Sequence, residues 1–456
     1  MALDIVIMAA GKGTRMKSRL PKVLHRLAGR SLLDHVLDTT ATLGADRTLV
    51  IIGHGADAVE RSMAHRDALA VRQEPQRGTG HAIQQVVPQL DDEGTTLILN
   101  GDVPLIEAAT ARTLVAACDG RRLALPTIEL PDATGYGRIV RTGDGAVRGI
   151  VEHKDATTEQ RAIREVYTGI MAAPSALLKR WVMALSDDNA QREYYLTDIV
   201  AMAVAEGVPV VAAQARDETE VLGVNSPQQL ADLERRLQRR RADAVMEAGV
   251  RQADPARFDL RGRLQAGQDV EIDVGCILEG EVVLGNDVRI GAHCVIRDCR
   301  IDDGAVIHPF SHLDRAQVGP GALVGPYARL RAGADIGEQV HIGNFVEVKN
   351  STLARGAKAN HLAYLGDADV GERVNYGAGS ITANYDGANK HRTVIEADVH
   401  IGSNCVLVAP VKIGAGGTVG GGSTVTRDTP PGQLTVARGR QATIAGWTRP
   451  VKQRKS

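Results

Sequence analysis

Residues 318–348 read VGPGALVGPYARLRAGADIGEQVHIGNFVEV, and an aliphatic residue returns at every sixth position of this stretch. These positions are Val318, Val324, Leu330, Ile336, Ile342 and Val348. The same step joins Leu284, Ile290 and Ile296, and later Ile401, Leu407, Ile413, Val419 and Val425. A period of six fits neither a helix nor the alternation of an ordinary strand. It is the signature of a hexapeptide parallel β-helix.

Each six-residue unit in such a fold supplies one flat side and one corner, and three sides close a coil of about eighteen residues. One aliphatic side chain per side points inward, and glycine serves corners that need positive φ. A β-sandwich of short strands would not keep so fixed a step. We therefore predict a left-handed parallel β-helix, with a C-terminal tail, over residues 250–456.

The period breaks between Ile381 and Ile401, where the polar segment 384–390 reads NYDGANK. A polar insertion that leaves a regular coil is typical of a projecting loop, and such loops often carry function.

The first part of the chain alternates compact apolar runs with amphipathic segments. The runs are Leu3–Met8, Arg47–Ile52 and Thr95–Leu99, and the segments include Ser31–Leu43 and Thr110–Ala117. This alternation predicts an α/β, Rossmann-like domain over residues 1–228, with a parallel, doubly wound sheet. Leu230, Leu233 and Leu237 then follow Ser226-Pro227 at helical spacing, which predicts a linker helix over residues 229–249.

Composition limits the classes of partner. A chain of 456 residues with a formal net charge of −1 has no overall basic character, so we expect no nucleic-acid partner. No apolar run is long enough to span a membrane. The five cysteines form no C-x-x-C pair, and the apolar start contains Asp4 and lacks a basic segment. These features favour a cytoplasmic protein with reduced thiols.

A glycine-rich turn, Gly11-Lys12-Gly13-Thr14-Arg15-Met16, follows the first predicted strand. It is neither a Walker A loop nor a complete G-x-G-x-x-G, but backbone N–H groups at such a turn bind phosphate. Arg15 and Lys22 add two cations. Asp102 follows a later strand, where open α/β sheets bind ligands. Taken alone, Asp102 is more often a turn residue and Lys22 a surface charge; their joint pattern favours a site.

Several motifs carry a family resemblance. Residues 9–16 with Pro21-Lys22, Gln73 with residues 78–82 (GTGHA), and residues 101–105 (GDVPL) resemble the nucleotide-sugar pyrophosphorylases. Residues 135–138 (GYGR), 152–155 (EHKD) and 223–225 (GVN) are similar to that family's sugar and metal motifs. With the hexapeptide half, nearly the whole chain resembles the bacterial bifunctional UDP-N-acetylglucosamine pyrophosphorylase / glucosamine-1-phosphate N-acetyltransferases.

For the first half, the resemblance implies attack by N-acetylglucosamine 1-phosphate on the α-phosphorus of UTP, with Arg15 and Lys22 as catalytic residues. It implies Mg²⁺ on Asp102 and Asn225. The implied UTP and UDP-N-acetylglucosamine site comprises Ala9, Ala10, Gly11, Lys22, Gln73, Gly78, Thr79, Asn100, Gly101, Asp102, Gly137, Glu152, Tyr167, Thr168 and Asn225. Two of these depart from the family pattern: Tyr167 stands where relatives usually carry Asn, and Asn100 where an aromatic residue is common.

For the second half, the resemblance implies acetyl transfer from acetyl-CoA to glucosamine 1-phosphate with His361 as the base. A side chain that titrates near neutrality suits deprotonation of the amine. The implied sugar-phosphate site comprises Arg331, Lys349, Tyr364, Asn375 and Lys390. The implied acetyl-CoA site comprises Ala378, Asn384, Tyr385, Ser403, Gly421 and Arg438. Because a flat-sided prism offers little concavity, we expect a homotrimer whose sites lie between subunits.

Two alternatives remain. In the first, the chain is a sugar-nucleotide pyrophosphorylase whose β-helix is only structural or regulatory; the set Arg331, Lys349, His361 and Tyr364 would then be absent. In the second, the chain is a non-enzymatic scaffold similar to exchange-factor subunits; Arg15, Lys22 and Asp102 would then be absent. Both sets are present.

Overall fold

A computed structural model describes residues 2–215 and 217–450, and internal contacts divide the chain into units of residues 1–237 and 238–456. Helix α8 (Pro227–Glu247) crosses this division. It begins and ends two residues before the predicted bounds of 229 and 249, with Pro227 as its first residue and the Ser226 hydroxyl accepting a hydrogen bond from the Gln229 N–H at 3.2 Å. No described helix is both long and apolar enough for a bilayer crossing.

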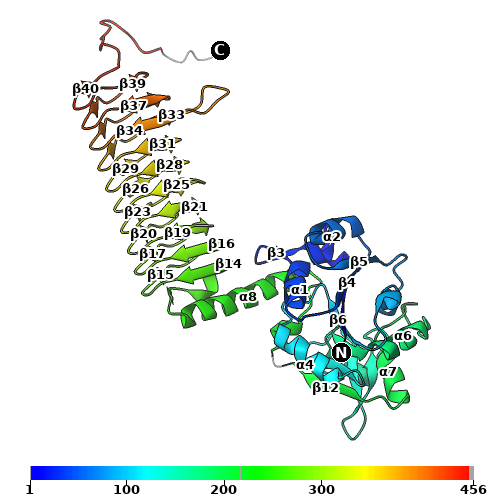
Figure 1. The fold of residues 1–456 in the computed structure, drawn as a ribbon. Coiled ribbons are helices and arrows are strands. Elements are labelled where there is room, and N and C mark those ends of the chain that lie inside the picture. Colours follow the sequence, from blue (N-terminus) through cyan, green and yellow to red (C-terminus); the bar gives the residue numbers. More distant parts are fainter. Residues whose placement is uncertain (1, 216, 451–456) are drawn as a thin grey trace. The chain divides into compact units, whose positions relative to one another are not determined.

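The first unit contains a mixed sheet with the strand order β5-β4-β1-β6-β11-β7-β10-β8-β9, and β12 pairs with β7 (Figure 1). Four neighbouring strands run parallel: β5 (Leu69–Arg72), β4 (Arg47–Ile52), β1 (Leu3–Ala9) and β6 (Thr95–Asn100). The predicted strands are therefore confirmed in this part. Alternate β1 residues pack into opposite layers, Ile5 and Ile7 into one and Val6 into the other, because successive strand side chains point to opposite faces.

The remaining strands correct the expectation of a wholly parallel sheet. Five of them join by antiparallel pairing: β11 (Met171–Pro174), β7 (Leu123–Glu129), β10 (Glu165–Tyr167), β8 (Arg138–Arg141) and β9 (Val147–Val151). Only β12 (Val210–Gln214) returns to the parallel direction, beside β7. Antiparallel neighbours need no crossover helix, so short connections such as that between β8 and β9 suffice.

Helices cover both faces of this sheet. They are α1 (Leu32–Ala41), α2 (Ala56–Met63), α3 (Thr79–Gln84), α4 (Ala108–Cys118), α5 (Thr158–Arg161), α6 (Ser175–Met183) and α7 (Asp198–Ala205). Helix α1 lies within the predicted amphipathic segment Ser31–Leu43, and α4 contains the predicted segment Thr110–Ala117 and extends beyond both of its ends. Burial on both faces explains why the central strands are nearly continuous apolar runs.

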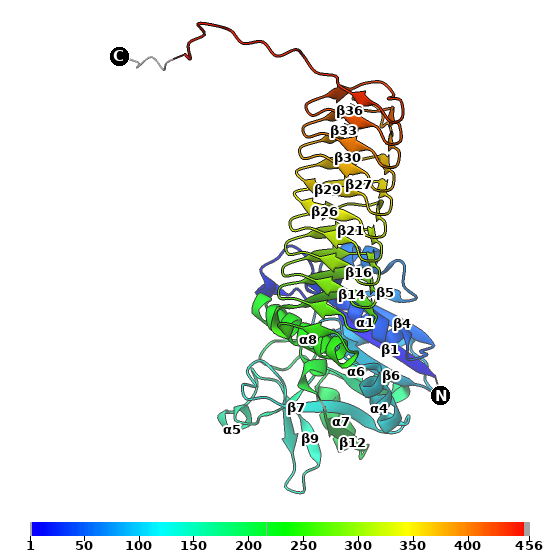
Figure 2. The same cartoon turned by 90° about the vertical axis from the view of Figure 1, so that its left-hand side faces the viewer.

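The second unit is a three-faced stack of short parallel strands (Figure 2). The first face comprises β13 (Arg251–Gln252), β15 (Glu271–Ile272), β17 (Arg289–Ile290), β20 (Val306–Ile307), β23 (Leu323–Val324), β26 (His341–Asn344), β29 (Lys358–His361), β32 (Asn375–Tyr376), β35 (His400–Ile401), β38 (Thr418–Val419) and β40 (Leu434–Thr435). The second comprises β14 (Asp259–Ala266), β16 (Ile277–Leu284), β18 (Val295–Arg297), β21 (His312–Asp314), β24 (Arg329–Leu330), β27 (Glu347–Lys349), β30 (Tyr364–Gly366), β33 (Ile381–Ala383), β36 (Val406–Val408) and β39 (Thr424–Val425). The third comprises β19 (Arg300–Ile301), β22 (Gln317–Val318), β25 (Ala334–Ile336), β28 (Ser351–Leu353), β31 (Ala368–Val370), β34 (Thr393–Ile395) and β37 (Val411–Ile413).

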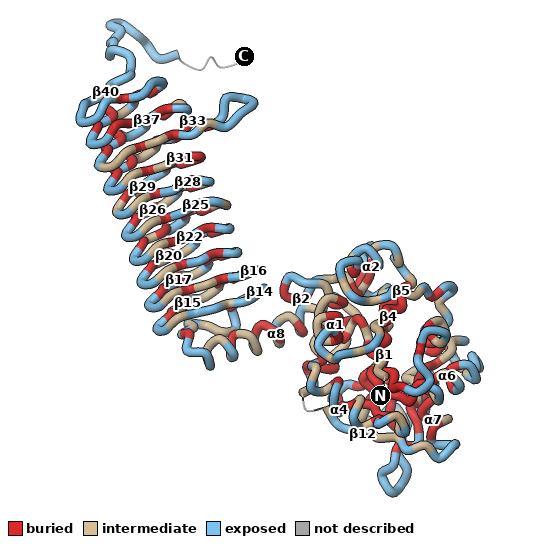
Figure 3. The backbone as a smooth tube through the Cα atoms, viewed as in Figure 1, coloured by how far each residue is buried: buried red, intermediate tan, exposed pale blue. Residues whose placement is uncertain are grey.

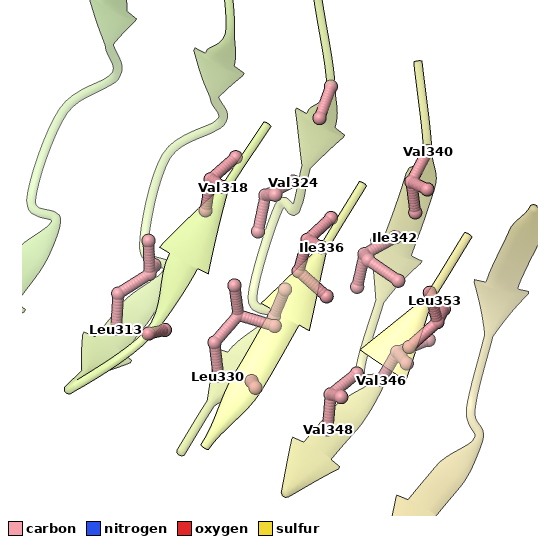
Figure 4. Close-up of a cluster of buried hydrophobic side chains, with 14 of the residues drawn as sticks. Leu313, Val318, Val324, Leu330, Ile336, Val340, Ile342, Val346, Val348 and Leu353 are labelled. Atoms are coloured by element: carbon pink, nitrogen blue, oxygen red, sulfur yellow. The ribbon is translucent and has the colours of Figure 1, made fainter. Parts of the chain in front are cut away.

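The interior of this stack is built from the six-residue series. Every residue of that series is at most 3% exposed, and buried positions line the inside of each coil (Figure 3). Figure 4 shows Val318, Val324, Leu330, Ile336 and Ile342 as successive members of this core. The predicted left-handed parallel β-helix is confirmed over the described residues, while residues 451–456 of the expected tail lie outside them.

The predicted projecting loop is present between β33 and β34. Strand pairing advances 17 residues from Tyr364 to Ile381 and then 25 residues from Ile381 to Val406. Tyr385 and Lys390 pair antiparallel across the inserted segment, which projects beside β33 in Figure 1.

Candidate functional sites

The glycine-rich turn leads from β1 into a short 3₁₀ helix at Thr14–Met16. Ala9 ends β1, and the side chain of Arg15 is exposed. Gly13 has φ of 58°, and a Cβ at this position would lie 2.7 Å from Lys22 Cβ. Glycine at this position therefore lets Lys22 pack directly against the turn.

Lys22, Asp102 and Asn225 meet although they are far apart in the sequence. Lys22 Nζ donates a hydrogen bond to the Asp102 carboxylate and another to Asn225 Oδ1, at 3.0 Å. The Val224 N–H donates to the Asp102 carbonyl at 2.9 Å, which fixes the two segments together. Lys22 and Asp102 side chains are only 14% and 16% exposed. Gly101, also expected here, is held to the end of β1 by its N–H, which donates to the Met8 carbonyl at 3.0 Å.

The segment expected to recognise the base is tied to the same turn. Gln73 Nε2 donates to the Gly78 carbonyl at 3.0 Å, and Gln76 Nε2 donates to the Ala10 carbonyl at 2.9 Å. Gly78 has φ of 99°, and a Cβ there would lie 2.6 Å from the Tyr194 carbonyl oxygen. Thr79 Oγ1 accepts a hydrogen bond from the Leu196 N–H at 3.0 Å, so it caps a neighbouring loop.

The residues expected at the sugar have mixed surroundings. The Tyr167 N–H donates to the Gly137 carbonyl at 2.9 Å, and Glu152 accepts a hydrogen bond from Thr197 at 3.0 Å. Burial raises the pKa of Glu152 above its ordinary value. Thr168 donates to the Pro126 carbonyl at 3.1 Å.

Tyr167 points into the core. It belongs to the same buried apolar cluster as Leu125, Ile139 and Met171, and its hydroxyl has no hydrogen-bond partner among the described residues. Asn100 lies against Gly169, because a Cβ on that glycine would be 2.0 Å from Asn100 Nδ2.

In the β-helix, three cations of the expected sugar-phosphate site gather on the second face: Arg331 and Lys349, expected at the phosphate, and Lys390, expected at the amino sugar. Leu330 pairs with Val348, so Arg331 and Lys349 occupy neighbouring positions in adjacent coils. Arg331 Nη1 donates to Glu347 Oε1 at 2.8 Å. Lys390, from the projecting loop, lies close to Lys349, and the approach of this second lysine, together with burial, lowers the pKa of Lys349.

Asp367 lies beside these cations and is absent from the residues expected at the site. Its carboxylate accepts hydrogen bonds from Asn350 Nδ2 and Asn384 Nδ2. Asn384, expected to contact acetyl-CoA, is only 8% exposed, and its side-chain amide is used in this bond. The signal available in the sequence was polar residues recurring at a 17-residue spacing.

A second column of expected residues runs up the end of the first face. Asn344 pairs with His361, and the strand register continues through Ala378, Ser403 and Gly421. His361 is exposed, and its Nδ1 lies 3.0 Å from Asn344 Oδ1. The Arg438 guanidinium donates to the Gly421 carbonyl at 2.7 Å. The expected base and four of the residues expected to bind acetyl-CoA therefore lie along one edge.

These two groups lie on different faces of the prism. His361 ends β29 on the first face, whereas Arg331 and Lys349 lie on the second face, and Leu362 projects from the corner between them with 62% exposure. Tyr364 begins the second-face strand after this corner, and Asn375 begins β32 on the first face. Tyr385 stays within its loop, where its hydroxyl donates to the Gly387 carbonyl at 2.6 Å.

An exposed aromatic ladder occupies the same corner in earlier coils. We define it as His293, Phe310, Tyr327 and Phe345, whose successive ring centroids are 5.2, 4.9 and 5.4 Å apart. All four residues have positive φ, a costly conformation for bulky side chains. This ladder was not predicted, although the spacing of its residues, 17 or 18 positions along the chain, is a signal that could have revealed it.

Comparisons with known proteins match both halves. Residues 5–135 match the MobA-like NTP transferase domain, residues 260–353 the GMPPB C-terminal domain, and residues 392–427 the bacterial transferase hexapeptide (six repeats). Curated relatives named "Bifunctional protein GlmU" match from end to end. The protein from Methylibium petroleiphilum is 75% identical over 99% of this chain and 100% of its own. That from Paracidovorax citrulli is 67% identical over 99% of each.

Proposed function

Because this chain belongs to the family of bifunctional GlmU proteins, we propose that it catalyses two successive transfers. The acetyl group of acetyl-CoA passes to the amine of glucosamine 1-phosphate, releasing CoA. The resulting N-acetylglucosamine 1-phosphate then attacks UTP, giving UDP-N-acetylglucosamine and pyrophosphate. We assign the second reaction to residues 1–228 and the first to residues 250–456. The observation that carries the proposal is that each unit holds its own charged group of residues suited to one reaction: Lys22 with Asp102 and Asn225 in the first unit, and Lys349 with Lys390 in the second.

In the uridylyl transfer, the chain's main task is to position phosphates and offset their charge, since phosphoryl-type transfer needs little acid–base help. The glycine-rich turn offers backbone N–H groups to the triphosphate. Lys22 lies against that turn, and the exposed Arg15, at the C-terminal end of the turn, can reach the phosphates. Gln73 and Gly78, joined to each other and through Gln76 to the turn, supply the uracil contacts.

The residues present fit Mg²⁺. Asp102 and Asn225 offer hard oxygen ligands, which this ion prefers, and both oxygens face one cationic atom, Lys22 Nζ. The ammonium thus stands where a metal cation would be held. When bound, Mg²⁺ would neutralise phosphate charge, and Lys22 would be released toward the phosphates.

In the acetyl transfer, His361 is the proposed base, taking a proton from the substrate amine as that nitrogen attacks the thioester carbon. Asn344 Oδ1, 3.0 Å from His361 Nδ1, would fix the ring so that Nε2 faces the amine. Arg331, Lys349 and Lys390 would hold the substrate phosphate. The edge formed by Ala378, Ser403 and Gly421 would carry acetyl-CoA, with Arg438 beside it.

Since the base and the phosphate-binding cations lie on different faces of one prism, we propose that a homotrimer brings one chain's base to another chain's cations. The aromatic ladder supports this assembly. Phe310, Tyr327 and Phe345 are 48%, 49% and 55% exposed, and the ladder leads directly to the corner beside His361. Burial of large rings is favourable at subunit contacts.

A cytoplasmic location accords with small-molecule substrates of this kind and with the five cysteines, all of which are free and buried. The test of function is an assay of purified protein with acetyl-CoA, glucosamine 1-phosphate, UTP and Mg²⁺. We expect CoA, pyrophosphate and UDP-N-acetylglucosamine. Pyrophosphate formation only from pre-acetylated substrate would instead support the pyrophosphorylase with a structural β-helix.

A further inference from the structure

Asn350, Asp367 and Asn384 stack in one corner of three successive coils. Asp367 is 6% exposed and has φ of 49°. Its two carboxylate oxygens each accept a hydrogen bond from one neighbouring amide. Because both donors are neutral, these bonds solvate the carboxylate without cancelling its charge.

The backbone of Asp367 links the two segments that carry the phosphate-binding lysines. Its N–H donates to the Lys349 carbonyl at 3.1 Å, and its carbonyl accepts from the Thr393 N–H at 3.1 Å, where the projecting loop rejoins the coil. Asn384, which the carboxylate holds, lies where that loop leaves. Asp367 therefore contacts β27 and both ends of the loop that carries Lys390.

The charges around Asp367 are mainly positive. Lys349, Lys390 and, more weakly, Arg392 act on its carboxylate. Burial opposes ionisation of Asp367, but the two amide bonds and the two lysines outweigh it and lower its pKa. Other nearby carboxylates are already paired: Glu347 with Arg331, and Asp369 with Arg392.

Without a buried anion, the repulsion from Lys390 would be unopposed, and Lys349 would lose its proton more readily. Three charged groups act on the pKa of Lys349. Lys390 and Arg331 lower it and so favour the neutral amine, whereas Asp367 raises it and favours the ammonium form. Two ammonium groups held together are what a phosphate dianion requires.

We propose that Asp367 is a positioning residue of the acetyltransferase site, which holds the segments of Lys349 and Lys390 together and offsets their mutual repulsion, so that both lysines face one substrate phosphate. This inference rests on the proposed acetyl transfer, because it assigns the cations to glucosamine 1-phosphate. Asp367 itself touches neither substrate nor the reacting atoms.

The test is Asp367→Asn, measured as the pH dependence of KM and kcat for glucosamine 1-phosphate. Asn tolerates positive φ, and a rotation of the Asn384 or Asn350 amide restores both hydrogen bonds, so the change removes mainly the charge. In the unaltered protein, KM should rise at alkaline pH as Lys349 loses its proton. In Asp367→Asn we expect this rise at a lower pH, so that KM at the alkaline end is about tenfold higher than in the unaltered protein. We expect kcat to change less than about twofold, because His361 is untouched.

Lys390→Gln is the opposing variant. Removing its charge raises the pKa of Lys349, so the alkaline rise in KM should move to higher pH, and this result remains measurable if Asp367→Asn folds poorly. Asp335→Asn, which removes an exposed carboxylate from β25, is the matched control and should leave the profile unchanged. An unshifted KM profile in folded Asp367→Asn would overturn the inference. Absence of acetyl transfer by the unaltered protein would instead overturn the proposed function.

Discussion

The two candidate sites differ in how the chain assembles them. In the first unit, a turn after β1, a turn after β6 and the segment before α8 bring Lys22, Asp102 and Asn225 into contact within one chain. In the second unit, the expected base and the expected phosphate-binding residues lie on different faces of one prism. The first architecture gathers its loops at one edge of a sheet. The second repeats its backbone along one axis and distributes side chains over flat faces.

A wound sheet forms a concave site from the loops at its own edge. A solenoid has flat faces, so it needs additional structure to form a concave site. The projecting loop is one such structure, since it brings Lys390 back to Lys349. A neighbouring copy, as in the proposed homotrimer, would be the other. We therefore expect the first site to tolerate dissociation of the protein into monomers and the second to depend on assembly.

The largest expected effect separates the two sites outright. His361→Ala should lower acetyl transfer by about 10²–10⁴-fold, the usual contribution of a general base, and leave uridylyl transfer intact. Asp102→Ala should do the reverse. Both activities are measured on the same preparations, each serving as the control for the other. Loss of both from either substitution would show that the sites are not independent.

Core substitutions compare the two folds. Ile342→Ala in the β-helix and Ile98→Ala in the first sheet each remove a fully buried side chain, at a cost of about 2–5 kcal/mol. Thermal unfolding, followed together with residual activity, should show Ile342→Ala losing acetyl transfer first and Ile98→Ala losing uridylyl transfer first. A single transition abolishing both activities at once would contradict separately folded units.

The aromatic ladder tests dependence on assembly. Tyr327→Glu puts a charge among stacked rings, and we expect the trimer to dissociate, with acetyl transfer reduced about thirtyfold or more, as for a central interface residue. Sedimentation velocity gives the oligomeric state. Asp335→Asn, on another face, is the control. A trimeric, fully active Tyr327→Glu protein would remove the ladder from the interface.

The smallest expected effect concerns Lys22. Its ammonium competes with a metal for Asp102 and Asn225. In the absence of nucleotide, Lys22→Met should therefore bind Mn²⁺ several-fold more tightly than the unaltered protein. This change corresponds to about 1 kcal/mol, the free energy of the partly buried ion pair that the metal no longer has to break. Electron paramagnetic resonance of free Mn²⁺ measures this without reference to turnover. Weaker metal binding in Lys22→Met would mean that the lysine helps to hold the metal.

Much of the fold follows from the sequence because its strongest signals are periodic. The six-residue series predicts the interior of the β-helix directly, and the runs at Leu3–Met8 and Thr95–Leu99 predict central strands. The direction of β11 could not be predicted, because an apolar run such as Met171–Pro174 carries no mark of parallel or antiparallel pairing. The family inferred from the motifs is confirmed by the end-to-end relatives.

The site was less predictable where a residue's role depends on its neighbours. Tyr167 occupies an expected sugar position, yet its ring packs into the core, since a large aromatic side chain gains more from burial there. Asn384 was expected to face acetyl-CoA, but its amide meets Asp367. The 17-residue recurrence of Asn350, Asp367 and Asn384 was the signal for that carboxylate, and it is weak because a single polar residue before an apolar strand has the composition of any turn.

The even step between coils has a consequence for how such a chain can change length. The lowest coils, from β13 to β20, contain none of the expected site residues, which begin at Arg331. Each coil there adds the same rise and presents the same paired edges to the next. Insertion or removal of a complete coil should therefore move the proposed acetyltransferase site along the axis without changing the faces on which its residues lie. Insertion of a partial coil would move every later side chain to a different face.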